Sequence, residues 1–421
     1  MGIAITEDHL QLAAVARAFL QGHDALGAAR AALAAPVDEL PSFWKEAAGL
    51  GWLGLHLPEA AGGSGFGLDE LAVVVAEFGR QAAPGPFLST VIASAVVAAH
   101  GSTDQRAAAL PGLADGSRVA GVGLGGSLVL RDGLLAGDGG LVVSAEVADV
   151  LLLPVGDDMV LVDRHLGGVS VGPTSGSLDR GRRVAAVTLA GCRVSSDNVL
   201  AGARSHAVQI ARALAAAEAA GGASACVDMA SEYAKIRVAF DRPIGQFQAI
   251  KHHCANMLAQ AELATAAAWD AARAASVPDE AELPTAVAAA VAFPAFLLCA
   301  NKNMQVHGGI GFTYAHDCHL YFRRAMSLMA LFGPVEAARE QVLAAALSGA
   351  RATAHLDPPE GSDELRTEVR AFAERYHALP EEERRGALLE SGYLLPHWPK
   401  PWGRAATPAQ QLVIDQELAG V

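Results

Sequence analysis

The sequence is short of basic residues. Lys and Arg number 31 against 45 Asp and Glu, which gives a formal net charge of −14 at pH 7. Nucleic acids and anionic membrane surfaces attract clustered positive charge, so we predict that neither is a partner. Charged residues make up only 18% of the chain and hydrophobic residues 52%. This composition excludes disorder and permits a large helical core.

Disulfide frameworks and membrane spans are also not indicated. The longest apolar stretch, residues 286–300, contains Pro294 and is shorter than the roughly 20 residues needed to cross a bilayer. Glu7 and Asp8 precede any apolar run, which argues against a secretory signal. We predict a cytoplasmic protein whose five cysteines are reduced thiols, because they are odd in number and widely spaced: Cys192, Cys226, Cys254, Cys299 and Cys318.

The hydrophobic period changes twice along the chain. From Thr6 to about His100, apolar residues recur every three to four positions, which indicates helices. From Val119 to about Leu200 the period is two, in short β-branched runs between glycine turns, which indicates a small antiparallel β domain. The chain is then Ala-rich and helical again. We predict an N-terminal helical domain at 1–118, a middle β domain at 119–203, a C-terminal helical domain at 204–352, and a further segment at 353–421.

The last segment repeats part of the first. Gly51-Trp52-Leu53, followed by Pro58 and Gly62, recurs as Gly392-Tyr393-Leu394, followed by Pro399 and Gly403, at a constant offset of 341 residues. Residues 412–417 resemble 71–77 near the same offset. A single long repeat indicates domain duplication rather than a solenoid. We interpret residues 353–421 as a linker and the truncated start of a second N-terminal-type domain, so that the chain is one half of a tandem protein.

Two segments of the C-terminal helical domain are candidate ligand contacts. "RVAFDRPIGQF", residues 237–247, ends one helix and leads into the next, where guanidinium groups, a Gln amide and free N–H groups suit a diphosphate. "QVHGGIG", residues 305–311, places three glycines where a long helix ends, more than a helix cap requires. Such a backbone is clear for close approach of a ligand. Taken singly, solvated arginines and a glycine cap with a packing contact explain the two segments as well.

Together the two segments resemble the acyl-CoA dehydrogenase family, whose C-terminal domain carries R-x-x-F-G-x-P-I-x-x-F-Q and later Q-x-x-G-G-x-G. The resemblance covers residues 1–350, including "GGSGFGLDEL" and "VTLAGCRVSSDNVLAG", and is closest to the first half of tandem actinobacterial members. It implies a mainly α fold with a middle β domain: a helical N-terminal domain, a barrel-like β domain and a C-terminal four-helix bundle.

The resemblance also implies FAD as the cofactor. In the family, these motifs hold the ADP and pyrophosphate of FAD across a subunit interface. Asp241 replaces the usual Gly of the first motif and places a negative charge near a phosphate. The residues implied to bind the cofactor are Arg237, Phe240, Gln248, Gln305, Val306, His307, Gly308 and Gly309.

The family's reaction requires a carboxylate. A Glu removes the α-proton of an acyl thioester while the β-hydrogen leaves as hydride, and hydrogen bonds to the thioester carbonyl stabilise the developing charge. Aligned on Arg324-Ala325, the usual base position is Phe332. The alternative base position is Ala211, just before Arg212, which the resemblance implies as a substrate contact. Neither position is acidic, so we predict that this half lacks the catalytic Glu.

Two other carboxylates are alternative bases. Glu218 lies in an apolar helix, where burial would raise its pKa into a range suited to a base; it can equally make a polar contact or face solvent. Glu336 lies one helical turn beyond Phe332. The flavin side of the family's site is also altered, because "VGLGGSL" and the strand at 141–144 lack the family's Thr-Glu-Pro, Gly-Ser-Asp and Trp signatures.

A metal site is a further alternative. Its candidate ligands lack the Cys-x-x-Cys or His-x-x-x-His spacing of metal sites, and we predict no metal. They are His252, His253, Cys254, His307, His316, Cys318 and His319.

The resemblance implies an FAD-dependent dehydrogenase that converts an acyl-CoA thioester to the trans-2-enoyl thioester and passes electrons to an electron-transfer flavoprotein. The expected assembly is a homo-oligomer or a pseudo-dimer with a second dehydrogenase copy, which would supply the Glu. The alternative is a catalytically silent half that braces an active copy.

Overall fold

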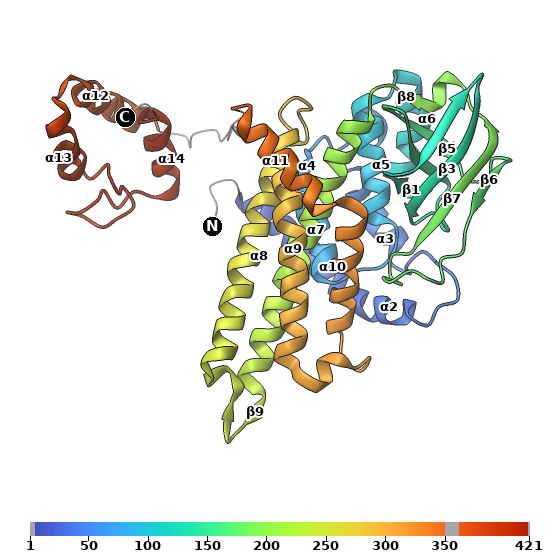
Figure 1. The fold of residues 1–421 in the computed structure, drawn as a ribbon, viewed down its shortest axis with the longest axis horizontal. Helices are drawn as coiled ribbons and strands as arrows, with labels where there is room; N and C mark the ends of the chain where they lie inside the picture. The colour runs from blue at the N-terminus through green and yellow to red at the C-terminus, as the bar shows by residue number, and fades with distance from the viewer. Residues whose placement is uncertain (1–4, 350–361, 420–421) are drawn as a thin grey trace. The chain divides into compact units, whose positions relative to one another are not determined.

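The computed structural model describes residues 5–349 and 362–419 (Figure 1). Contacts divide the chain into a larger unit, Gln11–Ala352, and a smaller unit, Thr353–Val421, with which Met1–Leu10 is grouped. The linker predicted around residues 353–361 lies outside the described residues.

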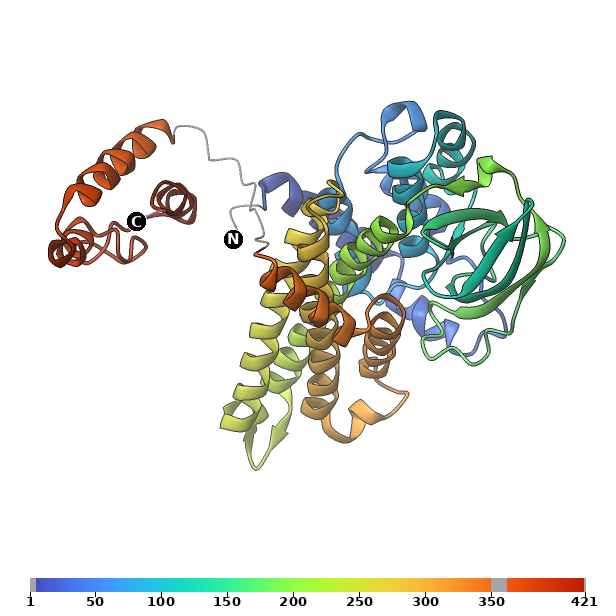
Figure 2. The same ribbon diagram turned by 45° about the horizontal axis from the view of Figure 1, so that its top comes forward.

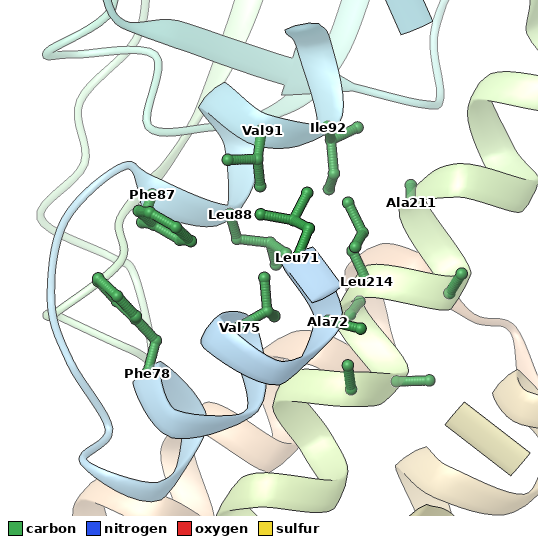
Figure 3. Close-up of a cluster of buried hydrophobic side chains, with 14 of the residues drawn as sticks. Leu71, Ala72, Val75, Phe78, Phe87, Leu88, Val91, Ile92, Ala211 and Leu214 are labelled. Atoms are coloured by element: carbon green, nitrogen blue, oxygen red, sulfur yellow. The ribbon is translucent and has the colours of Figure 1, made fainter. Parts of the chain in front are cut away.

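Helices form the first part of the larger unit, as the three-to-four spacing predicts. Leu71, Val74 and Phe78 are all buried, and Figure 3 shows Leu71, Val75 and Phe78 facing Phe87 and Leu88 of the next helix. Ser102 accepts a hydrogen bond from the Gln105 N–H and so caps a later helix. The helices are α1 (Glu7–Gly22), α2 (Ala25–Ala32), α3 (Trp44–Gly49), α4 (Leu68–Arg80), α5 (Phe87–His100) and α6 (Thr103–Ala114), with 3₁₀ turns η1 (Trp52–Gly54) and η2 (Glu59–Ala61).

An eight-stranded sheet follows, with the order β6-β7-β3-β1-β4-β5-β8 and β2 beside β3. The prediction of an antiparallel domain is wrong at one pair, because β1 and β4 run parallel. An alternating pattern fixes which face is buried but not the direction of a partner strand. The strands are β1 (Ala120–Gly123), β2 (Ser127–Arg131), β3 (Leu134–Val143), β4 (Val150–Val155), β5 (Asp158–Asp163), β6 (Val169–Val171), β7 (Val184–Arg193) and β8 (Val199–Leu200).

The third part is a helical bundle, which Figure 2 shows beside the sheet. Its helices are α7 (Arg204–Ile236), α8 (Gln248–Ala274), α9 (Glu282–His307), α10 (Cys318–Phe332) and α11 (Val335–Leu347). A short hairpin, β9 (Val238–Ala239) and β10 (Arg242–Pro243), and the turn η4 (Ile244–Gln246) join α7 to α8, and η5 (Gly308–Phe312) follows α9. The fold prediction is confirmed: a helical domain, a middle β domain and a C-terminal helical domain.

Two bundle helices are long and apolar enough to resemble membrane spans by length and composition. In α7, 94% of the most apolar window is buried inside the protein, and 61% in the helix that includes α9 and η5. The cysteines of the described residues are free thiols, as predicted, and Cys192, Cys226, Cys299 and Cys318 are buried.

Residues 362–419 of the smaller unit form three helices, α12 (Asp363–Ala378), α13 (Glu381–Ser391) and α14 (Pro408–Glu417). Its cluster of buried apolar side chains consists of Val369, Phe372, Tyr393 and Ile414. A core of this size gives little stabilisation, because small domains bury a small fraction of their surface.

Candidate functional site

The two candidate ligand segments meet at one end of the helical bundle. The Tyr233 ring, in the last turn of α7, stacks on the His307 ring at the end of α9, with centroids 4.3 Å apart. The hairpin β9–β10 and the start of α8 follow directly from this end of α7, and Figure 1 shows the hairpin at the foot of the bundle. Residues 237–248 and 305–309 therefore share one surface.

Most of the predicted cofactor contacts on this surface are open to solvent. Arg237, Phe240, Gln248, Gln305 and Gly309 are exposed, and Gly308 is half-buried. Val306 and His307 are buried instead. Buried side chains like these support the turn from beneath, whereas the exposed ones are free to contact a ligand.

The three glycines of the turn differ in whether the structure requires a glycine there. Gly308 caps α9 with φ 64° and ψ −139°, a positive-φ backbone that favours glycine. A Cβ on Gly311 would lie 2.7 Å from the Met304 carbonyl oxygen, so Gly311 is required for packing. Gly309 has neither constraint, because φ is not positive and a Cβ there would meet nothing within 4 Å. Gly309 is therefore the glycine that packing within this chain does not explain.

The hairpin turn carries two non-glycine residues in the left-handed region. Phe240 has φ 53° and Asp241 φ 60°, the backbone of a two-residue hairpin turn in which Asn-Gly or Asp-Gly is favoured. Asp tolerates this conformation better than most residues. The geometry explains why a Gly at position 241 would be ordinary, and it leaves the Phe240 side chain 88% exposed.

Neither base position of the family pattern lies in a polar setting. Phe332 and Ala211 are buried, and Figure 3 shows Ala211 beside the apolar cluster that contains Ile92 and Leu214. Glu336, the nearby alternative, is exposed in the first turn of α11. No group at these three positions combines a carboxylate with burial.

Glu218 is buried but is held by two guanidinium groups. Arg182 donates to both of its carboxylate oxygens, at 2.7 and 2.8 Å, and Arg324 Nη1 donates to Oε1 at 2.6 Å. Burial alone would raise the pKa of Glu218, but the charges of Arg182 and Arg324 lower it. Of the alternatives for Glu218, the polar contact is the one observed and the raised pKa is not, because Glu218 belongs to a buried ion network that also joins Arg324 to Asp179.

The histidines and cysteine weighed as metal ligands partly converge. One ligand atom each of His307, His316 and Cys318 lies within 4.8 Å of the others. Burial raises the pKa of the Cys318 thiol to about 12, so a cation would have to displace its proton to bind there. His307 also hydrogen-bonds the Asn303 carbonyl oxygen, at 2.9 Å from Nδ1. This hydrogen bond fixes the orientation of the His307 ring at the end of α9.

A separate cavity of about 420 Å³ lies near the start of α7. Arg212, the predicted substrate contact, lines it and donates to Gln341 Oε1 at 2.6 Å. Burial lowers the pKa of Arg212. Two buried polar atoms of cavity-lining residues, Gln209 Oε1 and Arg212 Nε, have no partner among the described residues. Sequence spacing gave no sign of Gln209 or Gln341, since neither belongs to a motif.

A helical domain, a sheet and a bundle with a glycine-rich turn at its end form the architecture of flavin-dependent dehydrogenases. Residues 6–117 match the family model "Acyl-CoA dehydrogenase, N-terminal domain", and residues 202–347 match "Acyl-CoA dehydrogenase, C-terminal domain". The chain belongs to the acyl-CoA dehydrogenase family, a family of FAD-dependent oxidoreductases.

Similar proteins include Acyl-CoA dehydrogenase FadE34 of Mycobacterium tuberculosis, which is 41% identical over 88% of this chain and 51% of its own length. The chain thus spans about half of that relative. Acyl-CoA dehydrogenase IpdE2 of the same organism is 33% identical over 76% of this chain and 91% of its own length. A solved steroid ACAD variant has 29% identity and a TM-score of 0.74, covering 82% of this chain and 98% of that chain.

Proposed function

We propose that the chain is one half of an FAD-dependent acyl-CoA dehydrogenase. Arg237, Gln248 and the turn at 305–309 would contact the ADP and pyrophosphate of FAD at an interface with a second dehydrogenase copy. The observation that carries this proposal is the convergence of the two exposed segments at one bundle end, with Gly309 open on its surface. When FAD is bound, it would accept the hydride that leaves the substrate.

The substrate would be an acyl-CoA thioester bound at the cavity beside Arg212. Gln209 Oε1 could accept a hydrogen bond from an amide N–H, and Arg212 Nε could donate one to a carbonyl. The pantetheine arm of an acyl-CoA offers both groups. Product would be the trans-2-enoyl thioester, with electrons passing to an electron-transfer flavoprotein in the cytoplasm.

The second copy would supply the catalytic carboxylate, because Phe332 and Ala211 cannot accept a proton. The same observation favours a second candidate function, a catalytically silent half that braces an active copy. The two candidates differ in whether this half itself contacts FAD.

A binding experiment separates the candidates. The purified chain, alone and mixed with a separately expressed dehydrogenase copy, is titrated with FAD, and bound flavin is read from its absorbance. Arg237→Ala and Gly309→Val should each weaken FAD binding at least about tenfold, by the loss of a charge-assisted hydrogen bond or of close approach. Arg131→Ala, which removes an exposed arginine on β2, is the matched control. Unchanged FAD affinity in both bundle variants would refute the flavin contact and favour the silent half.

Turnover of acyl-CoA with an artificial electron acceptor tests the missing base. The chain alone should show none, and Phe332→Glu should gain activity where Phe332→Gln, its uncharged match, does not. Activity in the unaltered chain would contradict the assignment of the base to the second copy.

A further inference from the structure

Arg212 is a buried cation to which the described residues offer no carboxylate. The residue is 6% exposed, and the acceptor that the described part of the chain gives its guanidinium is Oε1 of Gln341, a neutral amide oxygen 2.6 Å from Nη1. Nε has no partner there. Burial lowers the pKa of Arg212, because a desolvated guanidinium loses the hydration that stabilises its charge. Such a charge is costly unless an opposite charge compensates it.

Two other buried arginines of the larger unit are compensated. Arg182 and Arg324 share the carboxylate of Glu218, and Arg324 also pairs with Asp179. Burial alone would lower the pKa of Arg324, but the charges of Asp179 and Glu218 raise it. The fold thus provides carboxylates for these two guanidinium groups and, within the described residues, none for Arg212.

The edge of the Arg212 guanidinium that suits a carboxylate is the unused one. Arg17 donates from Nε and Nη2 to the two oxygens of Glu77, at 2.9 and 2.7 Å. Arg370 donates from the same two atoms to the oxygens of Glu417, at 2.6 and 3.0 Å. This side-on fork matches the geometry of a carboxylate. Arg212 uses Nη1 for its amide contact, so its Nε–Nη2 edge has no acceptor in the described parts of the chain.

This guanidinium borders a cavity whose charges balance. Arg212 lines the cavity of about 420 Å³ near the start of α7, together with Arg204, Asp157 and Glu282. Asp157 and Glu282 are exposed and therefore lie on the solvent side, whereas Arg212 lies deeper. A lining with two cations and two carboxylates suits a monoanion held by one guanidinium. It suits the phosphates of coenzyme A less well, because they carry several negative charges.

We propose that Arg212 binds a carboxylate on the acyl group of the substrate, so that the substrate class is the coenzyme A monothioester of a dicarboxylic acid. This assignment rests on the proposed function, which places an acyl-CoA in the cavity. A neutral carbonyl would satisfy the Nε–H of Arg212 but would leave its charge uncompensated, whereas a carboxylate satisfies both. An arginine left without compensation in the free protein is the kind of local violation expected at a binding site.

Equilibrium binding to the full chain tests the role of this charge. The ligands are coenzyme A monothioesters from succinyl-CoA to sebacoyl-CoA, each paired with the same acyl chain ending in a carboxamide. Isothermal titration calorimetry should show at least one carboxylate ligand binding at least about tenfold more tightly than its amide, the gain from a charge-assisted bidentate pair.

Variants of the two cavity arginines assign that preference. Arg212→Gln should bind both members of the pair equally. Arg204→Gln is the matched control, because Arg204 lines the same cavity but already donates to the Gly156 carbonyl oxygen at 2.8 Å, and it should keep the preference. Arg212→Lys retains the charge without the fork and should keep part of the preference. It provides the comparison if circular dichroism shows that Arg212→Gln does not fold.

Equal affinity for carboxylate and amide in the unaltered chain overturns the proposal and leaves the acyl-CoA site of the proposed function standing. A preference that persists in Arg212→Gln, or that Arg204→Gln also abolishes, overturns it as well. So does an equal loss of affinity for free coenzyme A in Arg212→Gln, since the anion is then a phosphate. Binding of the free dicarboxylic acids but of no thioester, with the same dependence on Arg212, would support the carboxylate site and refute the acyl-CoA assignment. Binding of none of these ligands refutes both.

Discussion

The carboxylate of Glu218 compensates the positive charges of two buried arginines. Glu218→Gln is expected to lower the free energy of unfolding by about 3–5 kcal/mol, because Arg182 and Arg324 would lose the carboxylate that compensates them. Urea denaturation followed by tryptophan fluorescence measures the change. Glu336→Gln, at an exposed glutamate of α11, should change it by less than about 0.5 kcal/mol. Equal stability of the two variants would contradict the structural role of Glu218.

The same network makes stability depend on acid pH. Since the charges of Arg182 and Arg324 lower the pKa of Glu218 in the folded protein, the stabilisation is present above the ordinary Glu pKa of 4.5 and is lost as pH falls through the folded value. Thermal denaturation between pH 7 and pH 3 should show a steeper acid loss in the wild type than in Glu218→Gln. Parallel pH profiles would show that other carboxylates dominate.

For single residues, the sequence predicts exposure at the glycine turn better than it predicts the ion-pair partners of Glu218. Gly308 and Gly309 could be recognised because helix ends and glycine clusters are local signals. The partners of Glu218 could not, since Arg182 precedes β7 and Arg324 lies on α10, far along the chain. The resemblance implies that Val306 and His307 contact the cofactor along with their neighbours, yet helix geometry turns both side chains inward.

Among the elements, α4 and α7 approach so closely that their backbones touch through glycine. A Cβ on Gly221 would lie 1.9 Å from the Ala76 carbonyl oxygen. Gly221→Ala should therefore destabilise the protein by about 1–3 kcal/mol through forced separation of the helices. Gly49→Ala, where a Cβ meets nothing within 4 Å, is the control and should be neutral or slightly stabilising in the same denaturation assay. Neutrality of Gly221→Ala would mean that α4 and α7 can shift apart freely.

The β9–β10 hairpin is expected to gain stability when its turn is relaxed. Asp241 has φ 60°, so Asp241→Gly should stabilise the protein by about 1 kcal/mol. Asp241→Ala removes the same charge without relaxing the backbone and should not stabilise it. Differential scanning calorimetry of the two variants gives the comparison; a gain in both would assign the effect to charge instead.

Whether a segment is a helix or a strand could be predicted where the hydrophobic period was clear. The direction of a strand relative to its partner could not. The runs 128–130, 141–143 and 186–189 all lie in strands, β2, β3 and β7. The parallel pairing of β1 with β4 depends on how the chain crosses the sheet, which a local pattern does not encode. The long apolar stretch with Pro294 lies in a helix, α9, because buried packing offsets the missing hydrogen bond.

For the whole molecule, the bundle end that carries the proposed FAD contacts is also apolar. Ile236, Phe240, Phe312 and Tyr314 are exposed there, and exposed large apolar groups gathered at one place mark interaction sites. We expect the chain to self-associate or to pair with a second dehydrogenase copy through this end. Phe312→Asp should lower the mass measured by sedimentation, whereas Val129→Asp on β2 should not. A monomer in the unaltered chain with no affinity for a second copy would contradict this expectation.

Arg17 and Arg370 each donate two hydrogen bonds to one glutamate, Glu77 and Glu417 respectively, and this duplicated Arg–Glu fork has a consequence for synthesis of the chain. Because α1 and α12 present the same Arg-Ala-Phe sequence, the helix of one copy can form its ion pair with the glutamate of the other. Repeated domains misassemble in this way when both copies are unfolded together. The order of synthesis separates them, since Glu77 leaves the ribosome and pairs with Arg17 long before Arg370 is made. Refolding from denaturant removes that separation, so exchanged pairings between copies should appear only in refolded protein.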